Sequence, residues 1–442
     1  MISKQDLLEV TFNPPQSDWP AICRRPLIES GALRLQVAKI IEAVRREGDP
    51  FLLELNDKFH GTQFPLRVDE EEFKAAERFL DGSLKEAIET AAQNIGKFHE
   101  AQSGTESEVE TMPGVRCWRR TVPIERVGLY IPGGSAPLFS TLLMLGVPAR
   151  IAGCSEIIVC TPPLSASEAG ELITKGCTIH PSISFCCALL GITTVFCVGG
   201  AQAVAALAYG TESVPKVDKI FGPGNQYVTE AKSLVSADGI AVDLPAGPSE
   251  VMVLADASAS PAFIAADLLS QAEHGPDSQV MLVCTEEKIA CQVQEELELQ
   301  LQKLERKVIA AQALKGSKAV VFDSIDKMFD FANSYAPEHL IVAVADATSY
   351  QSRIINAGSV FLGNYTPESA GDYASGTNHT LPTNGYARAW SGVSLDSFVK
   401  RITFQEISAA GLEALGPVIE AMAEAEGLQA HRNAVRIRMR RR

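Results

Sequence analysis

The stretch VGLYIPGGSAPLFSTLLMLGVPARIA, residues 127–152, decides the fold class of this chain. Val127 to Ile131 is a short apolar run typical of a buried strand, and Pro132-Gly133-Gly134 then interrupts it. Leu138 to Ala152 follows with the length and apolar content of a helix. A buried strand that turns through glycine into an apolar helix is the building unit of a parallel α/β sheet.

The same alternation continues along the chain. Further strand-like runs are Ile157 to Cys160, Thr193 to Val198, Lys219 to Phe221 and Ile240 to Asp243, with helix-like segments at Ser184 to Leu190, Ala201 to Tyr209 and Asn225 to Ser236. After Pro245-Ala246-Gly247-Pro248 the pattern begins again, with runs at Val251 to Leu254, Val280 to Cys284, Ala319 to Phe322, Leu340 to Val344 and Ser359 to Leu362. The chain is therefore predicted to be an α/β protein with two doubly wound, incomplete Rossmann-like parallel-sheet domains and small N- and C-terminal extensions.

These patterns divide the chain into expected parts. They are an N-terminal arm over 1–25, a larger α/β domain made of 26–121 and 250–385, a second α/β domain over 122–249, and a C-terminal extension over 386–442. Charged helices expected at Leu33 to Arg46 and Glu70 to Glu100 are most simply a layer that covers the sheet of the larger domain. Val435 to Arg440 alternates apolar and basic residues, which favours an edge or subunit-contact strand over a nucleic-acid patch.

The composition limits the classes of function. The chain has 442 residues and a formal net charge of −15, which argues against a nucleic-acid partner. It has ten cysteines but no C-x-x-C pair, and Met1 to Val10 is no export segment, as expected in a reducing cytoplasm. Val127 to Ala149 and Pro181 to Thr211 lack charge, yet their glycines and prolines favour buried strands and helices over membrane spans.

Residues able to bind metal or move protons gather in four short segments. In Ser270 to Pro276, Gln271 and His274 lie three residues apart at an expected helix end, so their side chains share one face. A polar helix terminus whose histidine lies near unpaired carbonyls explains this segment equally well. The other three segments are Tyr335 to His339, Glu368 to His379 and Glu426 to His431. We expect the segments beyond the carboxyl ends of the strands, where open α/β sheets bind ligands.

Three glycine-rich turns of the first unit are candidates for holding a dinucleotide. They are Tyr130 to Gly134, Val198 to Gln202 and Phe221 to Asn225. Their glycines would let backbone N–H groups approach a pyrophosphate at a helix start. None of the three matches G-x-G-x-x-G, so ordinary tight turns remain the alternative.

Taken together, these segments resemble the histidinol dehydrogenase family, over about Val122 to Val435. The resemblance rests on GLYIPGGSAPL from Gly128, VGGAQA from Val198, FGPGN from Phe221, DLPAGPSE from Asp243, SQAEHGPDSQ from Ser270, PEHL from Pro337 and GDYASGTNH from Gly371. Leu164 to Ser184 departs from the shorter family forms and looks like an elongated surface connection. The N-terminal hundred or so residues match only in general character.

The resemblance implies a cytoplasmic enzyme of histidine biosynthesis that oxidises L-histidinol to L-histidine through a bound aldehyde. It implies one Zn²⁺ per subunit and two molecules of NAD per turnover. The implied metal ligands are Gln271, His274, Asp372 and His431, and such a set of nitrogen and oxygen donors suits zinc, although manganese or cobalt would also be accepted. Cys117 and Cys154 are interpreted as structural residues rather than as nucleophiles.

The resemblance also implies roles for other residues. His339 is the expected general base and Glu338 the expected activator of water, which requires an irregular backbone at Pro337 for both side chains to reach one cavity. The residues implied to contact the substrate are Ser249, Gln271, His274, His339, Asp372, Glu426 and His431, and those implied to contact NAD are Tyr130, Gln202 and Asn225. His379 is expected to support the metal ligands indirectly.

The family forms homodimers in which the C-terminal extension completes the site of the partner, and we expect the same here. In this scheme the larger domain carries the metal and the catalytic residues, and 122–249 binds NAD. The alternatives are a related zinc and NAD dehydrogenase of another primary alcohol, a metal-dependent hydrolase that uses Glu338, and a zinc-stabilised binding protein. The carboxylate of Glu426 argues against an anionic alcohol as the substrate.

Overall fold

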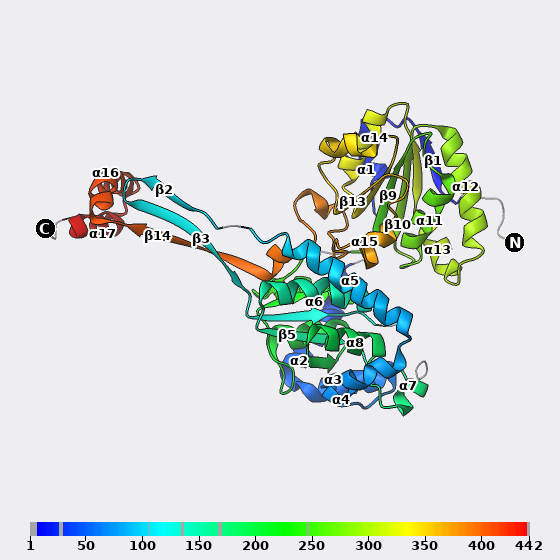
Figure 1. Cartoon of the computed structure of the whole chain (residues 1–442), viewed down its shortest axis with the longest axis horizontal. Helices are drawn as coiled ribbons and strands as arrows, with labels where there is room; N and C mark the ends of the chain where they lie inside the picture. Colours follow the sequence, from blue (N-terminus) through cyan, green and yellow to red (C-terminus); the bar gives the residue numbers. More distant parts are fainter. Residues whose placement is uncertain are drawn as a thin grey trace.

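The structure is a computed structural model, and it describes residues 7–25, 30–104, 106–133, 137–166, 170–244 and 247–439. Expectations that fall on residues 1–6, Gly134, Pro245-Ala246 and Arg440 lie outside the described residues. Figure 1 shows two α/β bodies and an arm that projects from them.

The first body is built on a five-stranded parallel sheet in the order β6-β5-β4-β7-β8. Its strands are β4 (Arg126–Tyr130), β5 (Glu156–Thr161), β6 (Thr194–Cys197), β7 (Lys219–Phe221) and β8 (Ala241–Val242). The helices between them are α6 (Phe139–Ala152), α7 (Gly170–Thr174), α8 (Pro181–Leu190), α9 (Gly200–Tyr209) and α10 (Gln226–Ala237). Every strand predicted for this unit is confirmed, although several ends shift by a residue or two.

The second body is built on a six-stranded parallel sheet in the order β1-β11-β10-β9-β12-β13. Its strands are β1 (Glu9–Phe12), β9 (Glu250–Ala255), β10 (Gln279–Cys284), β11 (Lys318–Val321), β12 (His339–Ala343) and β13 (Ser359–Leu362). Its helices are α1 (Trp19–Ile22), α11 (Pro261–Ala272), α12 (Glu287–Leu301), α13 (Lys307–Leu314), α14 (Ile325–Tyr335) and α15 (Glu368–Tyr373). Apart from β1, the strands follow the same order as in the first sheet, so the predicted fold class of two doubly wound α/β domains is confirmed.

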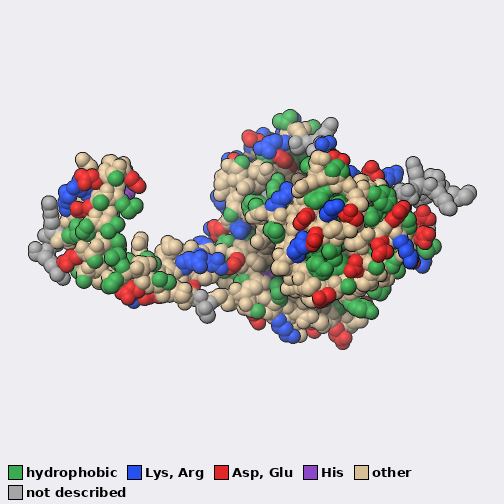
Figure 2. All heavy atoms as spheres, turned by 90° about the horizontal axis from the view of Figure 1, so that it is seen from above, with side chains coloured by type: hydrophobic (Ala, Val, Ile, Leu, Met, Phe, Trp, Pro, Cys, Tyr) green, Lys and Arg blue, Asp and Glu red, His purple; other side chains and the backbone are tan. Residues whose placement is uncertain are grey.

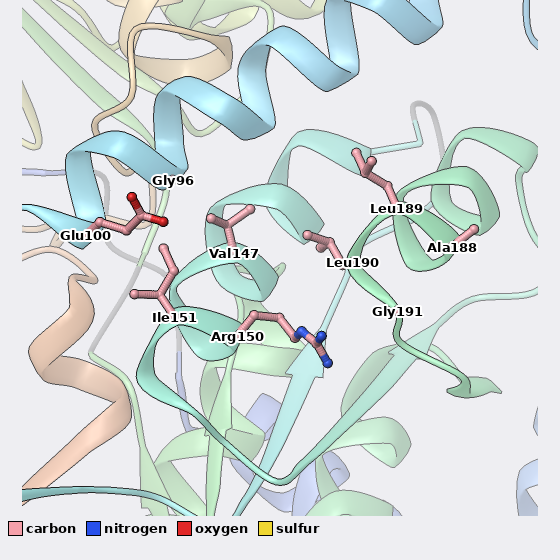
Figure 3. Close-up of a pocket in the computed structure, with 9 residues that line it drawn as sticks. All are labelled: Gly96, Glu100, Val147, Arg150, Ile151, Ala188, Leu189, Leu190 and Gly191. Atoms are coloured by element: carbon pink, nitrogen blue, oxygen red, sulfur yellow. The ribbon is translucent and has the colours of Figure 1, made fainter.

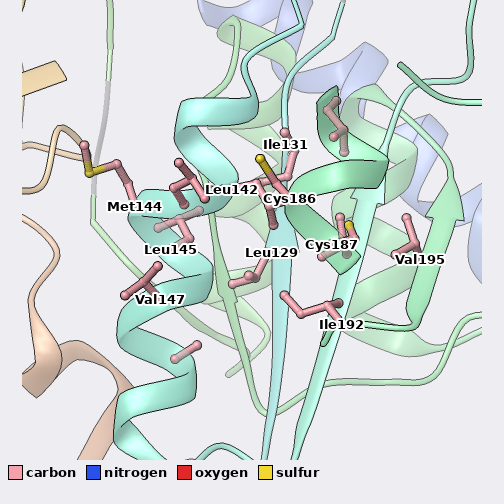
Figure 4. Close-up of a cluster of buried hydrophobic side chains, with 14 of the residues drawn as sticks. Leu129, Ile131, Leu142, Met144, Leu145, Val147, Cys186, Cys187, Ile192 and Val195 are labelled. Atoms are coloured by element: carbon pink, nitrogen blue, oxygen red, sulfur yellow. The ribbon is translucent and has the colours of Figure 1, made fainter. Parts of the chain in front are cut away.

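Apolar side chains cover both faces of each sheet, as parallel sheets require. Figure 4 shows one of these clusters, in which Leu142 and Leu145 of α6 meet Leu129 of β4 and Cys186 of α8. Most described residues of the uncharged stretches 127–149 and 181–211 are therefore buried in the first body. None of the described helices combines the length and apolar character that crossing a membrane requires.

The helices between residues 30 and 100 cover the five-stranded sheet, so the expectation that they cover the sheet of the larger domain is wrong. They are α2 (Ser30–Glu47), α3 (Asp49–His60), α4 (Glu70–Ala75) and α5 (Gly82–Glu100). Ile88 and Ile95 of α5 share one core with Leu129, and Val37 and Val44 of α2 share the core on the opposite face. The helical period shows that a helix has an apolar face, but it does not show which sheet that face covers.

The arm consists of a three-stranded antiparallel sheet and two helices at its end (Figure 1). Its elements are β2 (Glu108–Met112), β3 (Val115–Pro123), β14 (Val399–Ile407), α16 (Ala409–Ala425) and α17 (Gln429–Met439). Residues 108–121, which were expected in the larger domain, therefore form one sheet with a strand of the C-terminal extension. The strand predicted from Val435 is also wrong, because this segment forms the last turns of α17 and packs against Gly416 of α16.

Short 3-10 helices complete the described elements: η1 (Gln16–Asp18), η2 (Ala76–Phe79), η3 (Ala347–Arg353), η4 (Tyr386–Arg388) and η5 (Leu395–Phe398). The connection from Leu164 to Ser184 is less peripheral than expected. It carries α7 at the surface, but Cys177 and Ile179 are buried, and Glu72 of α4 accepts the backbone N–H groups of Thr178 and Ile179.

Candidate active site

The predicted catalytic and metal-binding residues of the second body meet at the amino ends of its strands, not at the carboxyl ends as expected. Glu338 precedes β12 and His339 is its first residue. Helix α11 follows β9 and returns antiparallel to the sheet, so Gln271 and the following His274 come back to the amino edge. The carboxyl-end rule concerns the loops that follow strands, and it does not cover residues at the far end of a crossover helix.

Both side chains of the Glu338-His339 pair bind the backbone of one residue, Glu250. The N–H group of Glu250 donates to Glu338 Oε2 at 2.7 Å, and His339 Nδ1 lies 3.1 Å from the Glu250 carbonyl oxygen. Ala336, two residues before Glu338, has a left-handed backbone with φ of 56°, and Pro337 follows it. This irregular entry brings two adjacent side chains to one point, as their predicted roles require.

The contact with Glu250 fixes the proton on the imidazole of His339. A carbonyl oxygen only accepts, so Nδ1 must carry the hydrogen, and Nε2 of the neutral ring is left with its lone pair. Nε2 is buried and has no hydrogen-bond partner among the described residues, and Asp372 Oδ1 lies 3.4 Å from it. Nε2 is therefore the nitrogen that can act as a general base once the ring is neutral.

Helix α15 supplies two carboxylates from one of its faces, Glu368 and Asp372. Glu368 is buried, and its carboxylate contacts the side-chain amide of Gln271. A carboxylate only accepts hydrogen bonds, so the NH₂ group of Gln271 donates to it and the amide oxygen faces the other way. Ligand atoms of His339, Glu368 and Asp372 all lie within 4.8 Å of one another.

The site gathers three acidic side chains around one imidazole. Burial by itself would lower the pKa of His339, but Glu368, Glu338 and Asp372 raise it to about 10. Burial raises the pKa of Glu338 to about 8 and lifts that of Glu368 well above its ordinary value. Such a cluster favours a bound cation, which would lower the pKa values of the acids.

His274 is an exposed residue three positions after Gln271. The protein packed around its ring lowers its pKa despite the nearby Asp372. The lowered pKa favours the neutral imidazole, which is the form that ligates metals. Gln271 contacts Glu368, and Asp372 acts on the charge of His274, so all three lie near this cluster; their role as metal ligands stays a prediction.

The loop that follows α15 binds helix α6 of the first body. His379 Nδ1 donates to the Asp372 carbonyl oxygen at 2.8 Å, so its Nε2 accepts the hydroxyl hydrogen of Thr141 across 3.2 Å. Beside it, the amide of Asn378 donates to the Met144 carbonyl at 2.6 Å. His379 thus holds the backbone of Asp372, and its indirect support of a metal ligand stays a prediction.

The other expected substrate contacts are divided between two places. Ser249 adjoins Glu250 at the amino edge of the second sheet, beside the catalytic pair. Glu426 and His431 are exposed on the arm, which lies away from the amino edge of the second sheet in Figure 1. A single chain therefore does not bring His431 to the other three predicted metal ligands.

The predicted cofactor residues meet at the carboxyl edge of the five-stranded sheet. Tyr130 ends β4, and its hydroxyl oxygen accepts the N–H group of Gly200 at 3.1 Å. Gln202 is buried beside the same turn, and Asn225 caps α10 by accepting two N–H groups. A Cβ atom on Gly222 would lie 2.1 Å from the Tyr130 carbonyl oxygen, so only glycine allows this approach. Because β4 and β7 are where the strand order reverses, the turns lie where α/β sheets bind nucleotides.

Two further features lie apart from this chemistry. Burial raises the pKa of Cys154 to about 11, which keeps the thiol protonated and supports its structural interpretation. An open hollow of about 370 Å³ lies between α5, α6 and α8, with Glu100 and Arg150 as its charged lining residues (Figure 3). It contains none of the predicted site residues.

The sequence analysis missed two buried acids that shape the site, Glu250 and Glu368. Each had a signal in the sequence. Glu250 is the one charged residue of an otherwise apolar strand, and Glu368 lies four residues before Asp372, on the same helical face. A buried carboxylate requires a hydrogen-bond donor or a positive charge beside it, so an acid at a buried position indicates a polar site.

Glycine turns at the reversal of a parallel sheet, together with a buried imidazole enclosed by acidic side chains, are typical of a nucleotide-linked α/β oxidoreductase. Known proteins narrow this class. The family model described as "Histidinol dehydrogenase" matches residues 23–439. The chain belongs to the histidinol dehydrogenase family, and it is an NAD-dependent oxidoreductase.

Individual relatives match over nearly the whole chain. Histidinol dehydrogenase of Bacteroides thetaiotaomicron is 56% identical over 434 residues, covering 98% of this chain and 99% of the relative. The protein of the same name from Vibrio parahaemolyticus is 53% identical, with 95% of each chain covered. The crystal structure of histidinol dehydrogenase from Elizabethkingia anophelis has a TM-score of 0.93 at 50% identity and covers 98% of each chain.

Proposed function

We propose that this protein oxidises L-histidinol to L-histidine through bound L-histidinaldehyde, with two molecules of NAD and one Zn²⁺ per subunit, as the last step of histidine biosynthesis. The observation that carries the proposal is the cluster of Glu338, Glu368 and Asp372 around the imidazole of His339. An acidic cavity of this kind fits both a divalent ion and an amino alcohol with an ammonium group. The named relatives support the same substrate.

The first oxidation needs a base for the hydroxyl proton. His339 Nε2 is the candidate, because it is buried without a hydrogen-bond partner among the described residues while Nδ1 is held by Glu250. The surrounding carboxylates hold this imidazole protonated until positive charge is bound beside them. Once the ring is neutral, it accepts the alcohol proton as hydride leaves the carbinol carbon, a contribution typically of about 100-fold or more.

The second oxidation needs a hydrated aldehyde, because only the gem-diol has a hydrogen whose loss as hydride yields the carboxylic acid. Glu338 is the candidate for removing a proton from water during this hydration. Its pKa of about 8 allows the carboxyl group to give and take protons near neutral pH. The balanced reaction consumes one water and gives two NADH for each histidinol.

The residues present fit zinc. Gln271, with its amide oxygen turned away from Glu368, His274 and Asp372 would hold the ion, and His431 of a second chain would complete the set. Bound zinc would supply a Lewis acid that orients and polarises the substrate, while NAD would supply the hydride acceptor. Tyr130, Gln202 and Asn225 are the proposed NAD contacts, and Ser249 and Glu426 the further substrate contacts.

The arm supports a homodimer with shared active sites. Figure 2 shows hydrophobic side chains along its surface, and the exposed large ones include Val109, Ile402, Val418, Met422 and Ile437. Exposed apolar side chains gathered on a projecting element are typical of a surface that another chain covers. A second copy whose arm crosses to the cluster would bring His431 and Glu426 to it.

The test is a stoichiometric assay with the purified protein. NADH formation and histidinol consumption are measured together, with and without a chelator followed by added zinc. The proposal expects two NADH per histidinol, loss of turnover on chelation and recovery with zinc. One NADH per substrate, or full activity of the metal-free protein, contradicts it.

A further inference from the structure

A buried ion pair holds the residue that aims the catalytic side chains. Glu250 is only 2% exposed, so its charge requires compensation. Arg25, from the N-terminal segment after α1, donates through Nε and Nη2 to the two carboxylate oxygens of Glu250, at 2.9 Å each. The backbone N–H of Asn384 adds a third donor at 2.9 Å.

Arg25 is itself held on several sides. Its guanidinium lies 3.7 Å above the centroid of the buried Tyr335 ring, and Nη2 also donates to the Tyr335 carbonyl at 2.9 Å. Tyr335 is anchored in turn, since its hydroxyl donates to Gln279 at 2.7 Å. The planar guanidinium stacks on the ring, binds both oxygens of the Glu250 carboxylate and donates to a carbonyl at the same time. The single ammonium group of a lysine cannot make all of these contacts.

The backbone of Glu250 is what this arrangement positions. In the ladder, His339 pairs with Val251, so Glu250 lies one residue before the first pair. Its N–H and C=O point toward β12, where the side chains of Glu338 and His339 bind them. A shift of Glu250 therefore moves the water-activating carboxylate and the base together.

We infer that Arg25 is a positioning residue for the oxidation chemistry, which acts through Glu250 on Glu338 and His339. The inference rests on the proposed function. Replacing a buried ion pair by apolar residues often leaves stability unchanged, which is consistent with a role in placement rather than in stability. The contacts of Arg25 include none of the proposed metal ligands, so its effect is expected on turnover and not on zinc binding.

The test measures kcat, KM for histidinol and bound zinc for Arg25→Lys. Misplacement of catalytic groups by about 1 Å costs up to about 100-fold, so we expect kcat to fall about 10- to 100-fold. KM and zinc content should change less than about 3-fold. The matched control is Arg353→Lys, whose arginine also pairs with a carboxylate and lies near an aromatic ring, but at the exposed surface of the same body.

A second variant, Glu250→Gln, tests whether Arg25 acts through Glu250. The double variant should be no slower than the slower single one, because both changes break the same link. The inference is overturned if Arg25→Lys matches the control, if kcat falls only in proportion to lost zinc, or if the two effects multiply. A wild-type protein that forms no NADH from histidinol overturns the proposed function and this inference together.

Discussion

The side-chain amide of Asn378 replaces a helical hydrogen bond that Pro148 cannot make. Pro148 lies inside α6 and has no N–H group, so the carbonyl of Met144, four residues earlier, lacks its helical donor. Asn378 donates to that carbonyl at 2.6 Å, and its own oxygen accepts the N–H of Thr380 at 3.0 Å. The predicted consequence is an energetic coupling between Pro148 and Asn378, although they lie on different bodies.

The perturbation is Asn378→Ala, alone and together with Pro148→Ala. Alone it leaves the Met144 carbonyl and the Thr380 N–H unpaired, and at about 1–3 kcal/mol for each buried group the cost is about 2–6 kcal/mol. In the Pro148→Ala background the restored N–H of residue 148 satisfies Met144, so only the Thr380 term remains. We therefore expect a coupling free energy of about 1–3 kcal/mol.

The assay is urea unfolding of the four proteins, followed by circular dichroism, with equal slopes required for the comparison. The matched control is Asn94→Ala. Its amide donates to the Ala374 carbonyl, next to the same loop, and no proline is involved. The control should cost the same in both backgrounds. If Asn378→Ala also costs the same in both, within about 0.5 kcal/mol, then Asn378 does not replace the missing bond.

Three further predictions concern the arm, one buried acid and one thiol. Glu338→Gln and His431→Asn chains, each expected to be inactive alone, are refolded together. Half of the randomly formed dimers then contain both variants and have one intact site of two, so about one quarter of wild-type NADH formation should return. No recovery would show that His431 does not act across subunits. Burial raises the pKa of Asp267 to about 7, above its unfolded value, so its contribution to stability is full at low pH and declines as pH rises through 7. Asp267→Asn should flatten the pH dependence of the free energy of unfolding of the metal-free protein between about pH 4 and 7, and parallel curves for the two proteins would refute this assignment. Cys154→Ala should leave kcat within about 2-fold of wild type, since the thiol stays protonated at neutral pH, and a loss of turnover with unchanged folding would revive a thiol mechanism.

The strands could be predicted because local sequence determines them. A fully buried parallel strand must be apolar along its whole length, and β10 (Gln279–Cys284) shows this in five successive residues. The three glycine-rich turns after strands were equally clear as turns, and at Gly222 the structure leaves no room for a Cβ atom. The strands and the glycine turns are thus determined by residues that are contiguous in the sequence.

What could not be predicted depends on contacts between distant segments. The apolar face of α5 is visible in the sequence, but its packing on the first sheet is not. In the same way, alternation in Val435 to Met439 fits a strand or the last turns of a helix, and packing on α16 decides between them. The polar segments were recognised, yet their meeting at the amino edge depends on the return path of α11. The ion pair of Arg25 with Glu250 joins residues too far apart for any local pattern to show.

The edge strand β1 has a consequence for how the protein emerges from the ribosome. Glu9 pairs with Lys318, so this first strand is synthesised about 300 residues before its neighbour β11. The five-stranded sheet and its covering helices lie entirely between β1 and β11 in the sequence. All strands of the first body are therefore synthesised before β11. The backbone N–H and C=O groups of β1 therefore stay unpaired while the first body folds. Pairing between strands so far apart in the sequence is slow and prone to misassociation. We expect the nascent chain to depend most on chaperones during this interval.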